Sequence, residues 1–205
     1  VDGASSGMLN YNNGNGEKEF TIEITPDDSV EANSQNEFYI EGKDGNAWKC
    51  RTSVTVTVGQ SHGAIMSLGN SGLYNVQPGQ DATTTLTVTN QGNGPDTFRI
   101  SASSPPTGWA VSLESSTIST QSRFSNEKTG TIDVTISLPL NALATEEVAI
   151  TFSVLPTSSG GAYATQELTI TVKAVHGMSG GAPAEDQTSR SDTTVKFPIT
   201  VTNDG

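Results

Sequence analysis

The stretch TTTLTVTNQG, residues 83–92, alternates apolar and polar side chains and then runs into a turn sequence. Leu86 and Val88 fall on one face of an extended chain and threonines fall on the other, which is the pattern of a half-buried antiparallel strand. The phrase returns in VKFPITVTNDG, residues 195–205. The chain therefore carries the same strand and turn sequence twice.

Two further matches have the same spacing. SVTVTVGQSHG (53–63) aligns with ELTITVKAVHG (167–177), and FTIEI (20–24) aligns with VTISL (134–138). All three matches keep the order of the chain, and each is offset by about 113 or 114 residues. A repeat of this length is typical of an immunoglobulin-like (Ig-like) sandwich, whereas solenoid repeats are much shorter. The repeated unit is therefore expected to be a domain.

The repeat divides the chain into three parts. We expect residues 1–60 to be the later half of one Ig-like repeat, residues 61–176 to be a complete Ig-like β-sandwich, and residues 177–205 to be a linker and the opening strand of a further repeat. The predicted fold class is all-β, with tandem Ig-like β-sandwich domains and an internal repeat of about 113 residues. The segment 139–148 could hold one helical turn, but its brevity and Pro139 favour a loop.

Alternation recurs along the whole chain, and Thr, Ser and Glu separate the apolar positions, as in antiparallel sheets with one buried face. The alternating sets are Phe20, Ile22 and Ile24; Phe38 and Ile40; Val54, Val56 and Val58; Phe98 and Ile100; Ile132, Val134, Ile136 and Leu138; Val148, Ile150, Phe152 and Val154; and Leu168, Ile170 and Val172. Turn sequences separate them: GKDGN (42–46), QPGQ (77–80), NQGNGPD (90–96), SPPTG (104–108) and SSGG (158–161). Short strands with turns rich in Gly, Pro and Asn predict a sandwich.

The charge of the chain excludes some classes of partner. Acidic residues outnumber basic residues by 22 to 10, which gives a formal net charge of -12. This field repels phosphate backbones and no cluster of Lys and Arg offsets it, so we expect no nucleic-acid partner. No apolar run approaches the roughly twenty residues that a membrane-spanning helix needs, so we expect no transmembrane segment in this chain.

The tryptophans and the single cysteine are candidate functional residues. Trp109 is in phase with Val111, so we expect its indole to plug the core rather than to stack on a sugar. Trp48 is in phase with Cys50 and Val54, and we expect both to be buried as well. With one cysteine in the chain, no intrachain disulfide can form.

His62 and His176 are the only histidines, and they occupy the same position in the two copies. Neither has a second His, an Asp or a Cys at ligand spacing beside it, so we expect linker packing rather than a metal site. The chain has no GxSxG motif, and adjacent carboxylates point apart on a strand, so we expect no catalytic residue. No cofactor is expected. Calcium is the alternative left open, because the loops 10–17 and 90–96 are rich in oxygen ligands, although neither has EF-hand spacing.

The run VQPGQDATTTLTVTNQGNGPDTFRISASSPPTGWAV (76–111), followed by VTISLP (134–139), resembles bacterial and archaeal Ig-like domains of the NEW3 and CARDB type. The matching features are a Pro-Gly turn before a Thr/Val strand, an Asn-x-Gly turn after it, then PPTGW and a later strand that ends in Pro139. The resemblance covers nearly all of residues 64–175. It implies a secreted or cell-surface protein with non-enzymatic domains in tandem, and it implies no universal ligand site.

The function that follows from the resemblance is a non-catalytic structural or adhesive segment, a stalk or spacer, of an extracellular or cell-surface repeat protein. The implied partners are neighbouring copies of the same domain, other surface proteins, or polysaccharide. Two alternatives stay open. One is an accessory module of a carbohydrate-active enzyme, which predicts an exposed aromatic cluster. The other is a filament subunit assembled by strand exchange through residues 195–201.

The strand-exchange alternative depends on VKFPITV at 195–201. Its apolar residues share one face, while a proline points the other way and cannot donate to a ladder, so we expect a strand at a sheet edge. The candidate strand-exchange residues are Val195, Phe197, Pro198, Ile199 and Val201.

Overall fold

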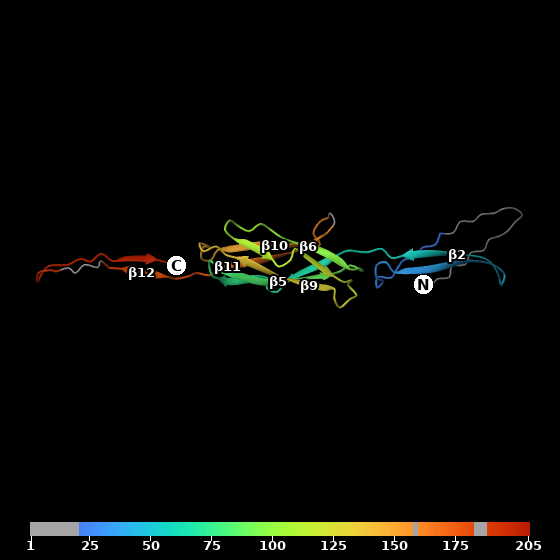
Figure 1. Cartoon of the computed structure of the whole chain (residues 1–205), viewed down its shortest axis with the longest axis horizontal. Helices are drawn as coiled ribbons and strands as arrows, with labels where there is room; N and C mark the ends of the chain where they lie inside the picture. Colours follow the sequence, from blue (N-terminus) through green and yellow to red (C-terminus); the bar gives the residue numbers. More distant parts are fainter. Residues whose placement is uncertain (1–20, 158–159, 183–187) are drawn as a thin grey trace.

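The computed structural model describes residues 21–157, 160–182 and 188–205, which form thirteen strands and no helix. A β-sandwich lies between two β-hairpins that extend from its opposite ends (Figure 1). The N-terminal hairpin is β1 (Gln35–Asp44) with β2 (Ala47–Thr57), and the C-terminal hairpin is β12 (Met178–Gly181) with β13 (Thr200–Asn203). The sandwich contains β3 (Ala64–Leu68), β4 (Gly72–Val76), β5 (Asp81–Asn90), β6 (Asp96–Ala102), β7 (Ala110–Leu113), β8 (Thr117–Thr120), β9 (Thr129–Ser137), β10 (Glu147–Pro156) and β11 (Ala164–Val172).

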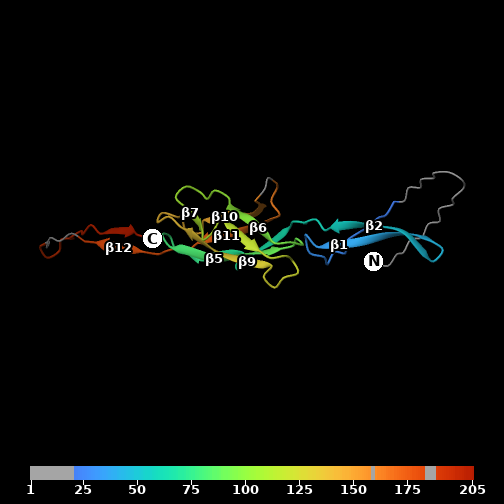
Figure 2. The ribbon, with the colours of Figure 1, turned by 45° about the vertical axis from the view of Figure 1, so that its right-hand side comes forward.

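The sandwich packs a four-stranded sheet, in the order β3-β5-β9-β7, against a five-stranded sheet, in the order β4-β11-β10-β6-β8. The β4–β11 pair is parallel, and the other pairs in both sheets are antiparallel. Figure 2, turned from the first view, again places the two hairpins at opposite ends of these sheets. The prediction of an all-β fold is confirmed.

The core of the sandwich is made by the alternating residues that the sequence identifies. Leu86, Val88, Phe152 and Leu168 are fully buried, while the side chains between them point away from the core. Trp109 is 7% exposed, so the prediction that it plugs the core is confirmed. Period two puts every second side chain on the inner face, and burial of that face stabilises the sandwich.

The turns also follow the sequence. Gly79 and Gly108 have φ angles of 72° and 88°, the left-handed region that glycine enters without strain, in the predicted turns QPGQ and SPPTG. The segment 139–148 forms turns and no helix before β10 begins at Glu147, as predicted.

The prediction that Trp48 and Cys50 are buried is wrong. Trp48 is 56% exposed, and Cys50 is exposed as well. Cys50 lies on the apolar face of the two-stranded sheet of β1 and β2, which no other sheet within the described residues covers. Trp48 lies on the other face, because the register shifts between Gly42 and Lys43 and Trp48 pairs with Lys43. The Nζ of Lys43 instead lies 3.7 Å from the centre of the Trp48 ring. Alternation predicts one shared face for Trp48 and Cys50, but the register shift separates them. Even the face that carries Cys50 would be buried only if a second layer packed on it.

Of two other predicted strands, one is absent and one is shorter than expected. Residues 21–24 of FTIEI are not in a strand, and Phe20 lies outside the described residues. In VKFPITV the strand β13 begins only at Thr200, so Val195, Phe197, Pro198 and Ile199 precede it without a ladder partner. An alternating segment becomes a strand only where a neighbour accepts its hydrogen bonds, and neither segment has such a neighbour within the described residues.

The domain boundaries at residues 60–61 and 176–177 stay predictions. The strands of the central sandwich run from Ala64 to Val172.

Candidate functional site at the hairpin junction

The loop between β5 and β6 holds the N-terminal hairpin against the sandwich. Asn93, 7% exposed, accepts a hydrogen bond at Oδ1 from the Ser61 amide (2.7 Å) and donates from Nδ2 to Gly59 O (3.1 Å) and Val30 O (3.4 Å). Its carbonyl accepts from the Ala32 amide (2.9 Å). One buried residue therefore binds both the linker after β2 and the turn before β1.

Two glycines in this loop allow the close approach. A Cβ on Gly92 would lie 2.4 Å from Ser61 O, and a Cβ on Gly94 would lie 3.0 Å from Ala32 Cβ. Neither glycine has a positive φ. The loop NQGNGPD was predicted as a turn, and the structure adds a second reason for its small residues, which is contact with the hairpin.

Asn90 fixes the shape of the same loop. It is fully buried, donates from Nδ2 to Gly94 O (3.0 Å) and Gln121 O (2.9 Å), and accepts at Oδ1 from the Gly92 amide (2.7 Å). A buried amide with its donors and acceptor satisfied holds one conformation, because any rearrangement leaves a polar group without a partner. The loop therefore presents Asn93 in a defined position.

The segment between β8 and β9 binds the hairpin from another side. Ser122 Oγ donates to Glu31 Oε1 (3.0 Å), and the Arg123 guanidinium donates to Asp28 O. Hydrogen bonds from two separate loops reach the turn that precedes β1. The hairpin is thus attached at more than one point, which a flexible linker would not provide.

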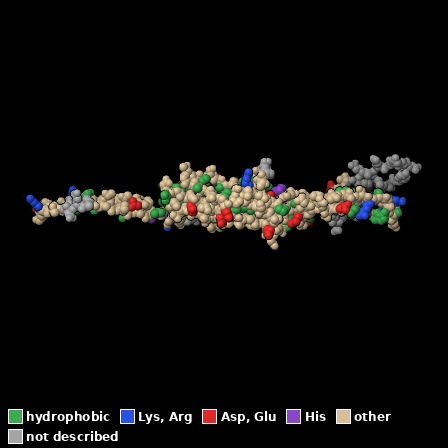
Figure 3. All heavy atoms as spheres, viewed as in Figure 1, with side chains coloured by type: hydrophobic (Ala, Val, Ile, Leu, Met, Phe, Trp, Pro, Cys, Tyr) green, Lys and Arg blue, Asp and Glu red, His purple; other side chains and the backbone are tan. Residues whose placement is uncertain are grey.

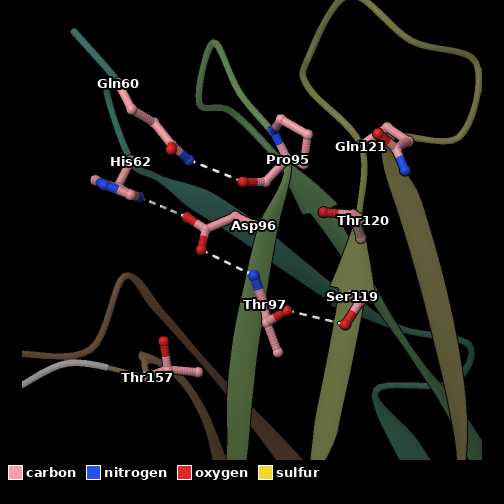
Figure 4. Close-up of a pocket in the computed structure, with 9 residues that line it drawn as sticks. All are labelled: Gln60, His62, Pro95, Asp96, Thr97, Ser119, Thr120, Gln121 and Thr157. Carbon is pink, nitrogen blue, oxygen red and sulfur yellow. Dashed lines mark hydrogen bonds and ion pairs between the residues drawn. The ribbon is translucent and has the colours of Figure 1, made fainter. Parts of the chain in front are cut away.

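An open pocket lies at the junction, between the linker and the edge of the five-stranded sheet (Figure 4). His62 Nδ1 lies 2.7 Å from Asp96 Oδ2, and Asp96 also accepts from the Thr97 amide (2.8 Å). Gln60 Nε2 donates to Pro95 O (2.8 Å). The His62–Asp96 and Gln60–Pro95 contacts therefore join the linker to the start of β6, which agrees with a linker role for the first histidine.

The second histidine, His176, lies beside a smaller open pocket at the base of the C-terminal hairpin, lined also by Gly177, Met178 and Asn203. Within residues 21–157, 160–182 and 188–205, no three His, Cys, Asp or Glu side chains are close enough together to hold a metal ion. Of the two oxygen-rich loops considered for calcium, 10–17 lies outside the described residues. In the other, Asn90 and Asp96 use their oxygens in the hydrogen bonds given above.

The outer face of β1 and β2 carries a polar network. The Arg51 guanidinium lies 3.6 Å from the centre of the Tyr39 ring, and Arg51 Nε lies 3.6 Å from Glu41 Oε1. The Tyr39 hydroxyl donates to Glu37, which lowers the pKa of that carboxyl, and Ser53 adds to the shift. This face is therefore suited to solvent, in contrast to the apolar face on the other side of the hairpin.

The candidate strand-exchange residues lie at the opposite end of the molecule from the junction. Phe197, Ile199 and Val201 are 55%, 70% and 63% exposed, Pro198 is exposed, and Val195 is half-buried. Figure 3 shows apolar side chains at the surface of both end hairpins and acidic side chains spread along the molecule. No helix in the part of the chain that the structure describes has the length and hydropathy needed to cross a membrane.

Sequence reasoning missed Asn93 and Met178. The signal for Asn93 was present in the pair of glycines that flank it, but a Gly-rich loop predicts a turn before it predicts a contact. Met178 stands in the strand sequence MSGG, which has too few apolar positions to show a period.

No protein-family model matches the chain, and no curated protein matches it either. The resemblance to NEW3 and CARDB domains therefore stays a prediction. Among solved structures, domains 4 and 5 of the S-layer protein SbsC are 22% identical, with 64% of this chain and 62% of that chain covered and a TM-score of 0.38.

Two other solved structures show the same level of likeness. A family 123 glycoside hydrolase from Clostridium perfringens is 10% identical, with 57% of this chain and 28% of that chain covered and a TM-score of 0.43. A putative carbohydrate binding protein from Bacteroides ovatus ATCC 8483 is 14% identical, with 55% and 38% covered and a TM-score of 0.39. The chain spans less than two thirds of each of the three structures.

Proposed function

We propose that this chain is a non-catalytic stalk or spacer segment of an extracellular or cell-surface repeat protein built from tandem Ig-like domains. The observation that supports the proposal is the junction, where buried Asn93 ties the N-terminal hairpin to one end of the sandwich. A hydrogen-bonded joint passes the orientation of one unit to the next, and a spacer needs this property to keep its length. The proposed partners are neighbouring copies of the same domain or other surface proteins.

The geometry does not favour the sugar-binding alternative. Trp109 is buried in the core, and one face of each exposed ring on the N-terminal hairpin is occupied by a cation, Arg51 over Tyr39 and Lys43 over Trp48. Tyr39 and Trp48 lie on the same face of the hairpin, since Trp48 pairs with Lys43, but each ring is already covered on one side. A carbohydrate platform needs open aromatic faces grouped on one surface.

Small-angle X-ray scattering on a dilute solution of the whole chain tests the spacer proposal. We expect the wild type to scatter as one extended particle with a narrow distribution of shapes. Gly92→Ala should loosen the joint, because its Cβ would lie 2.4 Å from Ser61 O. We then expect a broader distribution of end-to-end distances in the variant.

Gly161→Ala is the matched control, because a Cβ there meets nothing within 4 Å. This variant should scatter like the wild type. If the wild type behaves as a string of independently moving parts, or if Gly92→Ala leaves the curve unchanged, the junction does not hold the units and the proposal loses its support.

A further inference from the structure

The C-terminal hairpin repeats the pairing of β3 with β5 in the four-stranded sheet. Ala64 pairs with Asn90 in β3–β5, Met178 pairs with Asn203 in β12–β13, and the pairs that follow keep the same steps. In each hairpin the Asn Oδ1 accepts from the amide two residues later, at 2.7 Å after Asn90 and 3.2 Å after Asn203. The β12–β13 hairpin therefore has the local structure of half of one sheet of the sandwich.

The N-terminal hairpin corresponds to β10 and β11 of the other sheet, with β2 in the place of β11. Val54 pairs with Phe38 in β1–β2, and Ile150 pairs with Leu168 in β10–β11. The repeat offset aligns Phe38 with Phe152, so the two ladders share their faces but differ in register by two residues. The sequence match of 53–63 with 167–177 aligns Val54 with Leu168. In the sandwich Ile150 and Leu168 are fully buried, whereas Val54 is 43% exposed. The hairpin thus has the inner face of the five-stranded sheet without the layer that covers it.

Both hairpins expose large apolar side chains on the face that corresponds to an inner face of the sandwich. On the C-terminal side these are Met178 at 79%, Phe197 at 55%, Ile199 at 70% and Val201 at 63% exposed. The repeat aligns Ile199 and Val201 with Leu86 and Val88, which are fully buried in the sandwich. Apolar faces of this kind on both ends of one chain are typical of an interaction surface.

The sandwich shows how two such halves fit. In it, β3 lies against β11 and β10 of the opposite sheet. The counterpart of β3 is β12, and the counterparts of β10 and β11 are β1 and β2. We propose that the β12–β13 end of one copy packs on the apolar face of β1–β2 in a second copy and completes a composite sandwich there. This inference rests on the proposed spacer function and names the partner as a second copy of this chain.

The composite sandwich also provides partners for residues 21–24 and 195–199, the two alternating segments that form no strand. Ala82 pairs with Ile136 in the β5–β9 ladder, and the repeat aligns these residues with Val195 and Ile22. We therefore expect Val195 of one copy to lie opposite Ile22 of the other. The two hairpins and these segments supply no counterpart of β6 or β7, so the contact should be weaker than the folding of the complete sandwich and should reverse on dilution.

The interface joins two different surfaces, so it is head-to-tail and extends the molecule in a line rather than closing a dimer. The polar face of β1–β2, with Arg51 between Tyr39 and Glu41, stays in solvent in such an assembly. The face that is covered includes Cys50, the only cysteine, which belongs to the same side of the sheet as Val54.

Sedimentation velocity on the whole chain over about a hundredfold range of concentration tests the inference. We expect the wild type to grow from monomer to linear oligomers. Val54→Asp and Ile199→Asp should each stay monomeric, because a charge cannot be buried in the apolar contact. Thr57→Asp and Thr200→Asp, on the opposite faces of the same segments and paired with the uncharged Gln35 and Gly181, are the matched controls and should assemble like the wild type.

Mixing the two blocked variants separates a head-to-tail contact from other assemblies. Val54→Asp retains its C-terminal surface and Ile199→Asp retains its N-terminal surface, so the mixture should form dimers and stop there. In wild-type oligomers the Cys50 thiol should react with a disulfide reagent more slowly than in the monomeric variants at the same concentration.

A monomer at every concentration overturns the inference, as does assembly that survives both Asp substitutions or leaves Cys50 equally reactive. None of these results bears on the spacer function, which is tested by scattering from the dilute monomer. A flexible monomer that nevertheless assembles would contradict the spacer function and leave the interface standing.

Discussion

The Asn93→Ala substitution removes the central contact of the hairpin junction. The side chain makes hydrogen bonds of 2.7 and 3.1 Å, and a third at 3.4 Å that is too long to contribute much. A net contribution of about 1 kcal/mol for each of the two shorter bonds gives a loss of about 2 kcal/mol, or a factor of about 30 in the docking equilibrium of the hairpin. The core of the sandwich is untouched.

Native-state hydrogen exchange measures this loss of docking at a backbone amide of the junction. The Ala32 amide donates to the backbone carbonyl of Asn93, an acceptor that the variant keeps, so its exchange reports docking of the hairpin and should speed up by roughly 30-fold. Core amides of β5 and β9 should keep their wild-type rates. Asn126→Ala, at an exposed position in the loop after β8, is the control and should change neither. If Ala32 exchanges at the wild-type rate in Asn93→Ala, the side chain does not hold the joint, and the physical account of the spacer is wrong.

Two other predictions concern the stability of the parts. Leu86→Ala removes a fully buried side chain and should lower the free energy of unfolding by about 2 to 5 kcal/mol in chemical denaturation, whereas Thr87→Ala on the opposite face should cost far less. The Tyr39 hydroxyl lowers the pKa of Glu37, so this contact stabilises the N-terminal hairpin above the ordinary pKa of 4.5 and is lost as the pH falls through the lowered value. The Tyr39 ring signals in an NMR titration should report that loss, and Glu37→Gln should remove the acid step; an unchanged step in the variant would assign it to another group.

Part of the junction could be predicted from the sequence. The repeated histidines marked the linker region, whereas the Asn/Gly-rich loop 90–96 was predicted as a turn. The role of Asn93 could not be predicted, because its partners come from residues 30–32 and 59–61, far away along the chain. Hydrogen bonds between distant segments leave no local period in the sequence.

The sequence by itself determined the strands β5, β6, β9, β10 and β11 of the sandwich, the inner face that carries Leu86 and Val88, and the burial of Trp109, because alternation is a local property of an extended chain. Tertiary structure decided whether such a face is covered. Val54 and Ile199 have the same alternation as their buried counterparts, yet they are 43% and 70% exposed, since no second sheet packs on them within the described residues. Period two states which side chains share a face, but burial and a complete ladder require a partner that only the folded arrangement can supply.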